Sequence, residues 1–149
     1  MKRVLFILGL LSLSLTFVAC SDDDDDKVIS YDELPTKAQS FITTHFPDET
    51  KDQVKKDNDS YDVYLSKYKV EFDLSGEWDS VDGKRAGQKN VVPQSVLALI
   101  PNGILIYVAE EYLDTDIVEV DIEAYGYEVA LNNNIDLKFD KEGSFLGLD

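Results

Sequence analysis

Most of this chain is one sequence unit that occurs twice. An offset of 66 positions places much of the first half on the second half, and after one additional residue in a turn the offset becomes 67. The matched pairs include Leu34 and Ile100, Phe41 and Tyr107, Tyr61 and Tyr127, Phe72 and Phe139, and Gly76 and Gly143. So many ordered matches with a single slip indicate an internal repeat, and both halves are therefore expected to adopt the same local fold.

Each copy begins with the pattern of an amphipathic helix. In the first copy apolar residues recur every three or four positions, at Leu34, Ala38, Phe41, Ile42 and Phe46, and in the second copy they do so at Ile100, Ile104, Tyr107, Val108 and Tyr112. Pro35 and Pro101 precede these stretches and suit a first helical turn, where no N–H partner is needed. Pro47 ends the first helix.

Alternating apolar and polar residues follow each helix. The apolar series are Tyr61, Val63 and Leu65; Val70, Phe72 and Leu74; Val118, Val120 and Ile122; and Ile135, Leu137 and Phe139. This period of two is typical of antiparallel strands with one buried and one solvated face. We therefore predict an α+β fold of two tandem repeats, each with a helix packed on one face of a three- or four-stranded antiparallel sheet. The repeats span residues 32–82 and 91–149, the polar stretch 83–90 links them, and 91–99 adds a short helix.

The first 19 residues have the pattern of a bacterial lipoprotein signal peptide. Lys2 and Arg3 precede fifteen uncharged residues, from Val4 to Val18, which is short for a membrane span of about 20 residues. Ala19-Cys20 then resembles the end of a lipobox, in which the Cys thiol takes a diacylglyceryl group. Cys20 is the only cysteine of the chain, so lipidation explains its presence. The alternative is an ordinary signal peptide with an incidental cysteine.

Residues 20–31 form a predicted acidic tether behind the lipidated cysteine. Five consecutive aspartates repel one another and stay solvated, which favours an extended linker. The start of this segment resembles the signal that places lipoproteins on the outer face of the outer membrane in some Gram-negative bacteria; its residues here are Ser21, Asp22, Asp23, Asp24 and Asp25. We expect a lipid-anchored outer-membrane protein at the cell surface, or one that faces the periplasm if the signal reading is wrong.

The motifs of the repeat resemble one family. Leu34-Pro35, the Tyr-x-Val-x-Leu strand at Tyr61 and the Phe-Asp-x-x-Gly-x-Trp segment that begins at Phe72 are similar to the PepSY-like, β-lactamase-inhibitor-like domains. The resemblance implies an extracytoplasmic α+β domain whose open sheet face can hold a protein partner. A shared fold does not establish that this chain inhibits a β-lactamase.

Patterns of catalysis are missing from the sequence. His45 is the only histidine, and its counterpart in the second copy is Glu111, so no acid/base pair recurs. We interpret His45 as a packed residue near a helix end. The sequence has no Gly-rich phosphate loop and no nucleophile or metalloprotease motif. With 14 Lys and Arg against 30 Asp and Glu, the net charge of −16 argues against nucleic acid as a partner.

Strand alternation defines a candidate binding face. The residues assigned to it are Tyr64, Glu71, Trp78, Glu119, Asp121, Glu128 and Lys138. One interpretation is a solvated face that resists aggregation. The other is a docking face, in which Tyr64 and an exposed Trp78 anchor a protein or peptide and the acids attract a basic partner.

We therefore predict a non-enzymatic extracytoplasmic lipoprotein that binds a protein or peptide, in its most specific form an inhibitor of a peptidase or β-lactamase. No cofactor or metal is required by this hypothesis. The alternative is a calcium-binding or purely structural cell-surface lipoprotein, for which Asp57, Asn58 and Asp59, or Asp114 and Asp116, offer oxygen ligands without the spacing of an EF-hand.

Overall fold

The computed structural model describes residues 26–149. The predicted signal peptide, Cys20 and the signal residues from Ser21 to Asp25 lie outside the described residues. None of the helices in residues 26–149 is long and apolar enough to cross a membrane.

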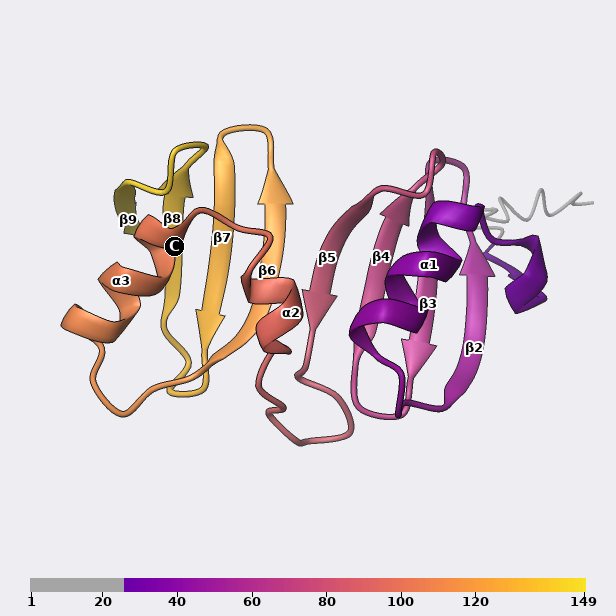
Figure 1. Cartoon of the computed structure of the whole chain (residues 1–149), viewed down its shortest axis with the longest axis horizontal. Helices are drawn as coiled ribbons and strands as arrows, with labels where there is room; N and C mark the ends of the chain where they lie inside the picture. The colour runs from indigo at the N-terminus through magenta and orange to yellow at the C-terminus, as the bar shows by residue number, and fades with distance from the viewer. Residues whose placement is uncertain (1–25) are drawn as a thin grey trace, which may run out of the picture.

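A single antiparallel sheet of nine strands organises the molecule, and the strands lie side by side in chain order (Figure 1). The strands are β1 (Lys27–Ile29), β2 (Lys51–Lys56), β3 (Ser60–Leu65), β4 (Lys69–Asp73), β5 (Trp78–Asp82), β6 (Ile117–Glu123), β7 (Gly126–Leu131), β8 (Asp136–Asp140) and β9 (Phe145–Leu148). The α-helices are α1 (Thr36–His45), α2 (Gln94–Leu97) and α3 (Asn102–Glu111), and one 3₁₀ turn spans Tyr31–Glu33. The molecule is thus a mixed α/β structure.

The two predicted sheets are one continuous sheet, because β5 pairs with β6. Val81 lies opposite Val120, and the next pair is Asp82 with Glu119. The linker keeps these strands together: the Gly83 N–H donates to the Val118 carbonyl, and the Asn90 N–H donates back to Gly83. The alternation pattern predicts β3, β4, β6 and β8 but carries no information about which edge strands meet, so this junction is a finding of the structure.

A second difference concerns the start of the folded part. The tether was predicted to reach residue 31, but Lys27–Ile29 form β1 on the outer edge of β2. Ile29 lies opposite Val54, the one buried residue of the polar strand β2, and packs against the core. This contact explains why the last part of the predicted tether is a strand of the folded domain.

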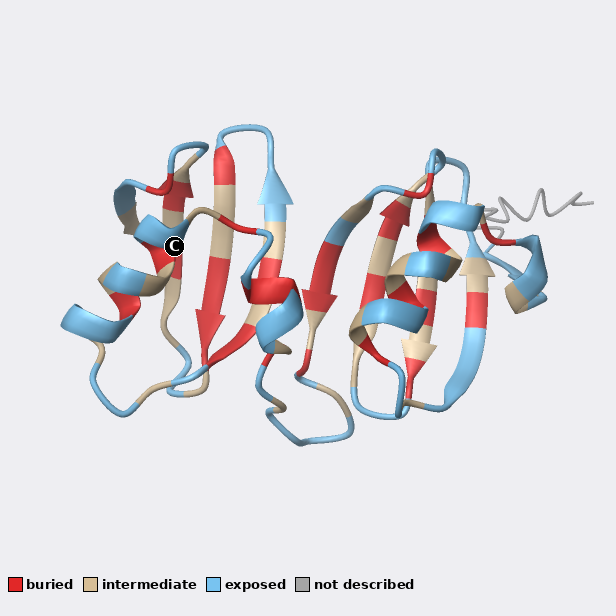
Figure 2. Cartoon of the chain, viewed as in Figure 1, coloured by how far each residue is buried: buried red, intermediate tan, exposed pale blue. Residues whose placement is uncertain are grey.

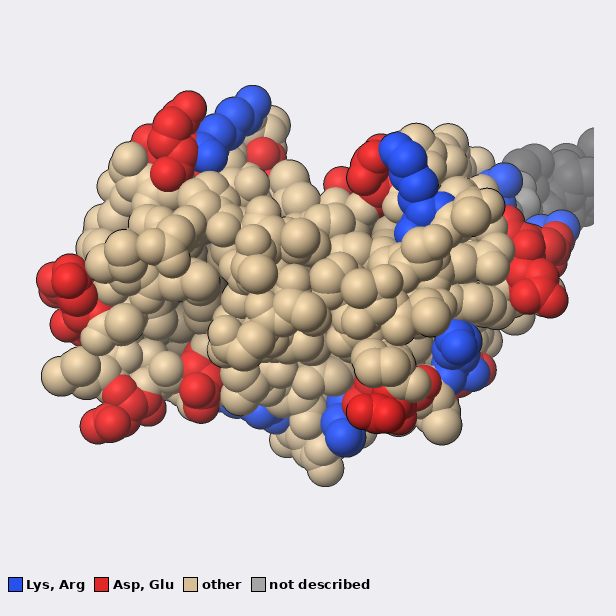
Figure 3. Space-filling model, in the orientation of Figure 1, with Lys and Arg blue, Asp and Glu red and all other residues tan. Residues whose placement is uncertain are grey.

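The helices pack on one side of the sheet, and the core lies between them and the strands (Figure 2). On the strands, fully buried residues alternate with partly exposed ones, as in β4, where Val70 and Phe72 are buried. On the face shown in Figure 3 charged side chains lie mainly around the rim, and the middle is formed by other residues. No helix of residues 26–149 covers the opposite side of the sheet.

Matched aromatic stacks hold α1 and α3 on the sheet. Phe41 of α1 stacks on Trp78 of β5, with ring centroids 5.7 Å apart, and meets Phe72 edge-on at 5.6 Å. In the second half Tyr107 stacks on Phe145 at 4.4 Å and meets Phe139 edge-on at 5.5 Å. Offset-stacked and edge-to-face pairs are the favoured arrangements of aromatic rings. The same contacts at matched positions therefore attach each helix to its strands.

The Phe-Asp-x-x-Gly-x-aromatic motif forms a tight turn in both halves. The Asp73 carboxylate accepts N–H bonds from Ser75 and Glu77, and Asp140 accepts them from Glu142 and Ser144. The glycine in each turn has a φ of +87° and lies against the proline that begins the helix. A Cβ at either glycine would come within 2.7 Å of that proline's Cβ, so the turn and the helix start are packed together.

Replacing Gly76 or Gly143 by alanine is expected to lower the free energy of unfolding by about 1–3 kcal/mol, because the new Cβ meets the proline and the positive φ is strained. The matched control is Gly87→Ala, which has a similar φ of +76° but open space around the added Cβ. Denaturant unfolding measures all three. A loss at Gly76 no larger than the loss at Gly87 would show that the turn-to-helix contact contributes nothing.

Candidate functional site

The side of the sheet without helices, here called the open face, carries a continuous row of side chains from β2 to β8. Its members, each paired with the next across neighbouring strands, are Lys55, Asp62, Glu71, Ser80, Asp121, Glu128 and Lys138. Their neighbours along each strand, such as Val63, Val81 and Val129, are fully buried in the core on the helix side. Successive side chains of a strand alternate between faces, so the row faces away from the helices.

Charge is unevenly distributed along this row. The two lysines stand at its ends, and the four acids lie between them, on either side of Ser80. A neighbouring row adds Asp82 of β5 and Glu119 of β6, which lie opposite one another. Acidic groups from both halves of the molecule therefore meet where β5 and β6 pair. The continuous sheet creates this concentration, because neither half contains it alone.

Several of these carboxyl groups have raised pKa values, because their surroundings make the ionised form less favourable. Burial raises the pKa of Asp121, and the charges of Glu128 and Glu71 raise it further, while a hydrogen bond with Ser80 acts in the opposite direction. Burial also raises the pKa of Glu119, although its contact with Lys84 opposes the shift. On β5, burial together with nearby Asp73 and Glu71 raises the pKa of Asp79. The centre of the open face thus holds two partly desolvated acids, of which Glu119 is paired with Lys84 and Asp121 forms no ion pair within residues 26–149.

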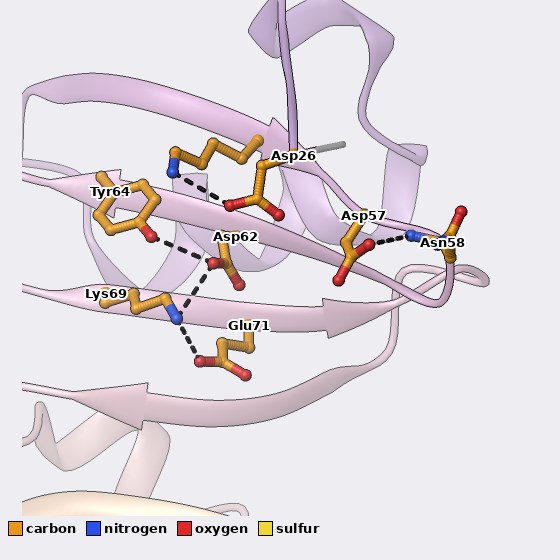
Figure 4. A network of polar contacts seen from close by, with 8 residues as sticks. Asp26, Asp57, Asn58, Asp62, Tyr64, Lys69 and Glu71 are labelled. Atoms are coloured by element: carbon orange, nitrogen blue, oxygen red, sulfur yellow. Dashed lines mark hydrogen bonds and ion pairs between the residues drawn. The ribbon is translucent and has the colours of Figure 1, made fainter. Parts of the chain in front are cut away.

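Tyr64 lies in a polar network at one end of this face (Figure 4). Its hydroxyl donates to Asp62 at 3.1 Å, and Lys69 of β4 pairs with the same carboxylate at 3.1 Å and with Glu71. Burial opposes the charge of Lys69, but these two acids outweigh it and raise the pKa of Lys69. Asp26, the first described residue, pairs with Lys55 at 3.2 Å.

Cations surround the ring of Tyr64. Lys55 and Lys69 each lie 5.7 Å from its centroid, and the Arg85 guanidinium lies at 5.3 Å. Cation–π contacts within about 6 Å are attractive. Burial raises the pKa of Tyr64, so its hydroxyl remains protonated at neutral pH. Three cations therefore lie within cation–π distance of this ring on the open face.

Six of the seven residues predicted for a binding face lie on the open face. They are Tyr64, Glu71, Glu119, Asp121, Glu128 and Lys138. Trp78 does not join them, because it lies on the helix side against Phe41. A bulge between Glu71 and Phe72 shifts the β4–β5 register and sets Trp78 opposite Phe72, on the core side.

Sequence reasoning missed four members of this region. Asp79 and Asp82 belong to β5, whose alternation is broken by the bulge, so their face could not be assigned. Lys84 and Arg85 lie in the segment interpreted as a polar linker, yet Lys84 pairs with Glu119 and Arg85 pairs with Asp52 at 3.1 Å. The only signal of this role in the sequence is the positive charge of Lys84 and Arg85, which contrasts with the acidic strands.

The sites considered for calcium are poorly suited to a metal as they stand. In residues 26–149 no group of three or more His, Cys, Asp or Glu side chains is placed to hold a metal ion. The Asp57 carboxylate accepts the Asn58 N–H within its own turn, and Asp116 accepts from Asn132 at 3.2 Å. These contacts occupy oxygens that a metal would need.

A pocket of about 420 Å³ lies beside α1 and not on the open face. Phe41, His45 and Trp78 line it, with the Lys37–Glu77 ion pair at its border. His45 packs on Phe41 with centroids 4.5 Å apart, and its buried Nδ1 has no hydrogen-bond partner. Burial lowers the pKa of His45, so the ring is neutral at pH 7. His45 is a packed residue, as the sequence indicates.

Comparison with known proteins places the chain in a family. The model of the family described as "Putative beta-lactamase-inhibitor-like, PepSY-like" matches twice, over residues 23–67 and 59–147. The chain belongs to this PepSY-like family. The two matches overlap, and the second begins inside the first copy, so they do not coincide with the copies recognised in the sequence. The resemblance inferred from the motifs is confirmed. No curated protein matches the chain.

Solved structures from Bacteroides are similar to most of the PepSY-like chain. A "putative calcium-regulated periplasmic protein" from Bacteroides thetaiotaomicron has 37% identity and a TM-score of 0.75, and the match covers 85% of this chain and 98% of the other. A "putative periplasmic protein" from Bacteroides vulgatus has the same identity, coverage and TM-score. A second B. vulgatus protein, of unknown function, has 30% identity and a TM-score of 0.74 over 83% of this chain and 98% of the other. These relatives are described as periplasmic, and none is described as an enzyme.

Asp121→Asn is expected to stabilise the protein at neutral pH. Because folding raises the pKa of Asp121, ionising this group costs stability above the folded-state pKa, and the cost disappears as the pH falls below the unfolded-state value. Thermal unfolding between pH 3 and pH 8 should therefore show the variant above the wild type at the upper end, with the difference shrinking toward acid.

Asp140→Asn is the matched control with the opposite sign. Backbone N–H bonds from Ser144 and its neighbours lower the pKa of Asp140, so its charge stabilises the fold above its unfolded-state pKa and that gain is lost as the pH falls through the lowered value. The variant should be less stable than wild type at pH 7. If both variants shift in the same direction at pH 7, the charge argument for the open face is wrong.

Proposed function

We propose that this PepSY-like protein is a non-enzymatic lipoprotein that holds a basic protein or peptide on its open face. The observation that carries the proposal is the central acidic row, in which Asp121 is partly desolvated, lies among other acids and forms no ion pair within residues 26–149. Cationic side chains of a partner would supply the missing charge. They would also lower the raised pKa values, so binding would release protons and weaken as the pH falls through that range.

The repeat architecture supports a binding role. We infer that the two halves are copies of one helix-on-sheet unit, since their aromatic stacks and turns recur at matched positions. Register shifts recur as well, between Lys51 and Gln53 in one half and between Ile117 and Glu119 in the other. Joining two such units through β5 and β6 doubles the width of the uncovered sheet, which gives a partner a broad, rigid surface.

Tyr64 is the proposed anchor of this surface. Tyrosine combines a large apolar ring with a polar hydroxyl and is enriched among residues that dominate binding energy. Its ring is fixed by Lys69 and Arg85, so little side-chain entropy would be lost on binding. If the partner is an enzyme, occupation of this face by its active-site rim would make the protein an inhibitor.

Capture of binding partners from envelope extracts tests the proposal. Glu71→Lys combined with Glu128→Lys should reduce recovery of the specific partner by about tenfold or more, because like charges placed against a basic partner cost several kcal/mol. Tyr64→Ala should reduce it too.

The matched control is Glu110→Lys combined with Glu111→Lys, which makes the same change in charge on exposed positions of α3. This control should retain the partner. Equal losses in the two double variants would mean that net charge and not the open face governs binding, and equal retention would exclude the open face.

Membrane attachment through Cys20 is the second part of the proposal. Cys20→Ser should leave the unfolding midpoint unchanged and abolish both lipid labelling and membrane retention, since a non-lipidated chain has no acyl anchor. Alanines in place of the aspartates from Asp22 to Asp26 should keep the lipid but remove the protein from the cell surface, as measured by protease digestion of intact cells. Unchanged digestion would contradict the export assignment and leave a periplasmic location.

Calcium regulation is the second candidate function, favoured by the description of the B. thetaiotaomicron relative. A ligand that binds only the folded protein raises its midpoint of unfolding. Melting in millimolar Ca²⁺ and in equal Mg²⁺ separates the candidates. The leading proposal expects the same midpoint in both, and a rise specific to Ca²⁺ that is lost in Asp57→Asn would replace it.

A further inference from the structure

The two outer edges of the sheet are unlike each other. At one end β1 is only three residues long and carries the charge of Lys27 next to Asp26, which disfavours further pairing at that edge. At the other end, among the strands of residues 26–149, β9 pairs with β8 alone, and its sequence from Phe145 to Leu148 is uncharged. Uncharged edge strands with free N–H and C=O groups are ready to pair with another strand.

The first half of the molecule contains a strand at the matched position, β5, whose outer edge is paired with another strand. β5 and β9 occupy matched places, each following the Asp-x-x-Gly turn. The outer edge of β5 is covered by the antiparallel strand β6, with Val81 opposite Val120 on the core side. Val81 is 0% exposed, whereas its counterpart Leu148 is 61% exposed. Leu148 is therefore an apolar residue at a position where the other copy buries one under a neighbouring strand.

Other residues at this edge share that character. Leu146 is 57% exposed, and Phe145 is 38% exposed beside Tyr107. Gly147 has open space where a side chain would stand, so it can accommodate a large residue of a neighbouring strand. The edge thus offers apolar contacts in addition to free backbone groups.

The charge near the β9 edge indicates which kind of strand can pair with it. Around β9 the open face carries Asp136, Asp140 and Asp149, with Lys138 as the cation, which is already paired with Asp149. A second copy of this chain, with its net charge of −16, would be repelled. A strand with apolar residues toward the helix side and basic residues toward the open face fits both the apolar and the charged parts.

We propose that β9 receives an extended, basic segment of a partner protein as a tenth, antiparallel strand. The inference rests on the proposed binding function and specifies how the partner is held: backbone hydrogen bonds to Phe145–Leu148, an apolar residue against Leu148, and basic residues over the neighbouring acids. The partner would then extend from this edge across the open face.

A synthetic peptide based on β6 tests this inference. The probe is the sequence of Ile117–Glu123 with each of its three acids replaced by lysine, and the control is the same lysine peptide with alternate backbone amides methylated to block pairing. Nuclear magnetic resonance titration of the wild-type protein should show the largest shifts and new protection from hydrogen exchange at the amides of β9. The methylated peptide should not give this protection.

Variants on the two edges complete the test. Leu148→Lys should weaken the lysine peptide by about tenfold, the cost of losing one apolar contact, while Val28→Lys on β1 should leave it within about twofold. Shifts confined to the open face, with equal binding by both variants, would overturn the edge proposal and leave the open-face function standing. No binding at β9 would also overturn it. Concentration-dependent dimers abolished by Leu148→Lys would identify a second copy as the occupant instead.

Discussion

The stacking of one helix aromatic on one strand aromatic is the contact on which this architecture depends. Phe41 on Trp78 and Tyr107 on Phe145 fix both helices to the same side of the sheet, and each stack is completed by a buried phenylalanine, Phe72 or Phe139. Trp78 and Phe145, the aromatic residues that follow the Asp-x-x-Gly turns, form these stacks, and the glycine of each turn lies against the proline that begins the helix. The turn, the helix start and the strand therefore form one packed unit. Within residues 26–149 no helix covers the other side of the sheet.

The acidic charge of the open face is concentrated where the two units join. β5 and β6 place their polar sides next to one another, so Asp82 meets Glu119 and the row from Asp62 to Glu128 becomes continuous. Burial raises the pKa of the acids at this junction, which is unfavourable for the isolated protein. Lys84 compensates Glu119, but Asp121 has no cationic partner within residues 26–149, which is consistent with a surface that is neutralised from outside.

Local sequence patterns predict much of this structure, since they reflect which side of each element is buried. The spacing of Ala38 and Ile42 locates α1, and the alternation of Val63 with Tyr64 assigns Tyr64 to the open face. Trp78 shows the limit, because a single bulge reverses the face of an aromatic residue and alternation does not reveal bulges. The role of Arg85 beside Tyr64 also requires the tertiary structure, as it joins residues far apart in the chain.

The family and the related structures establish the fold, the related structures are described as periplasmic proteins, and the proposed binding role rests on the chemistry of the open face. Carbodiimide labelling of carboxyl groups, read by mass spectrometry with and without the captured partner, tests that role most directly. The account predicts that the partner protects Glu71 and Glu128 while Glu110 on the helix side is labelled equally in both samples. Protection of Glu110 with unchanged labelling of Glu71 and Glu128 would place the partner on the helix side and contradict the account.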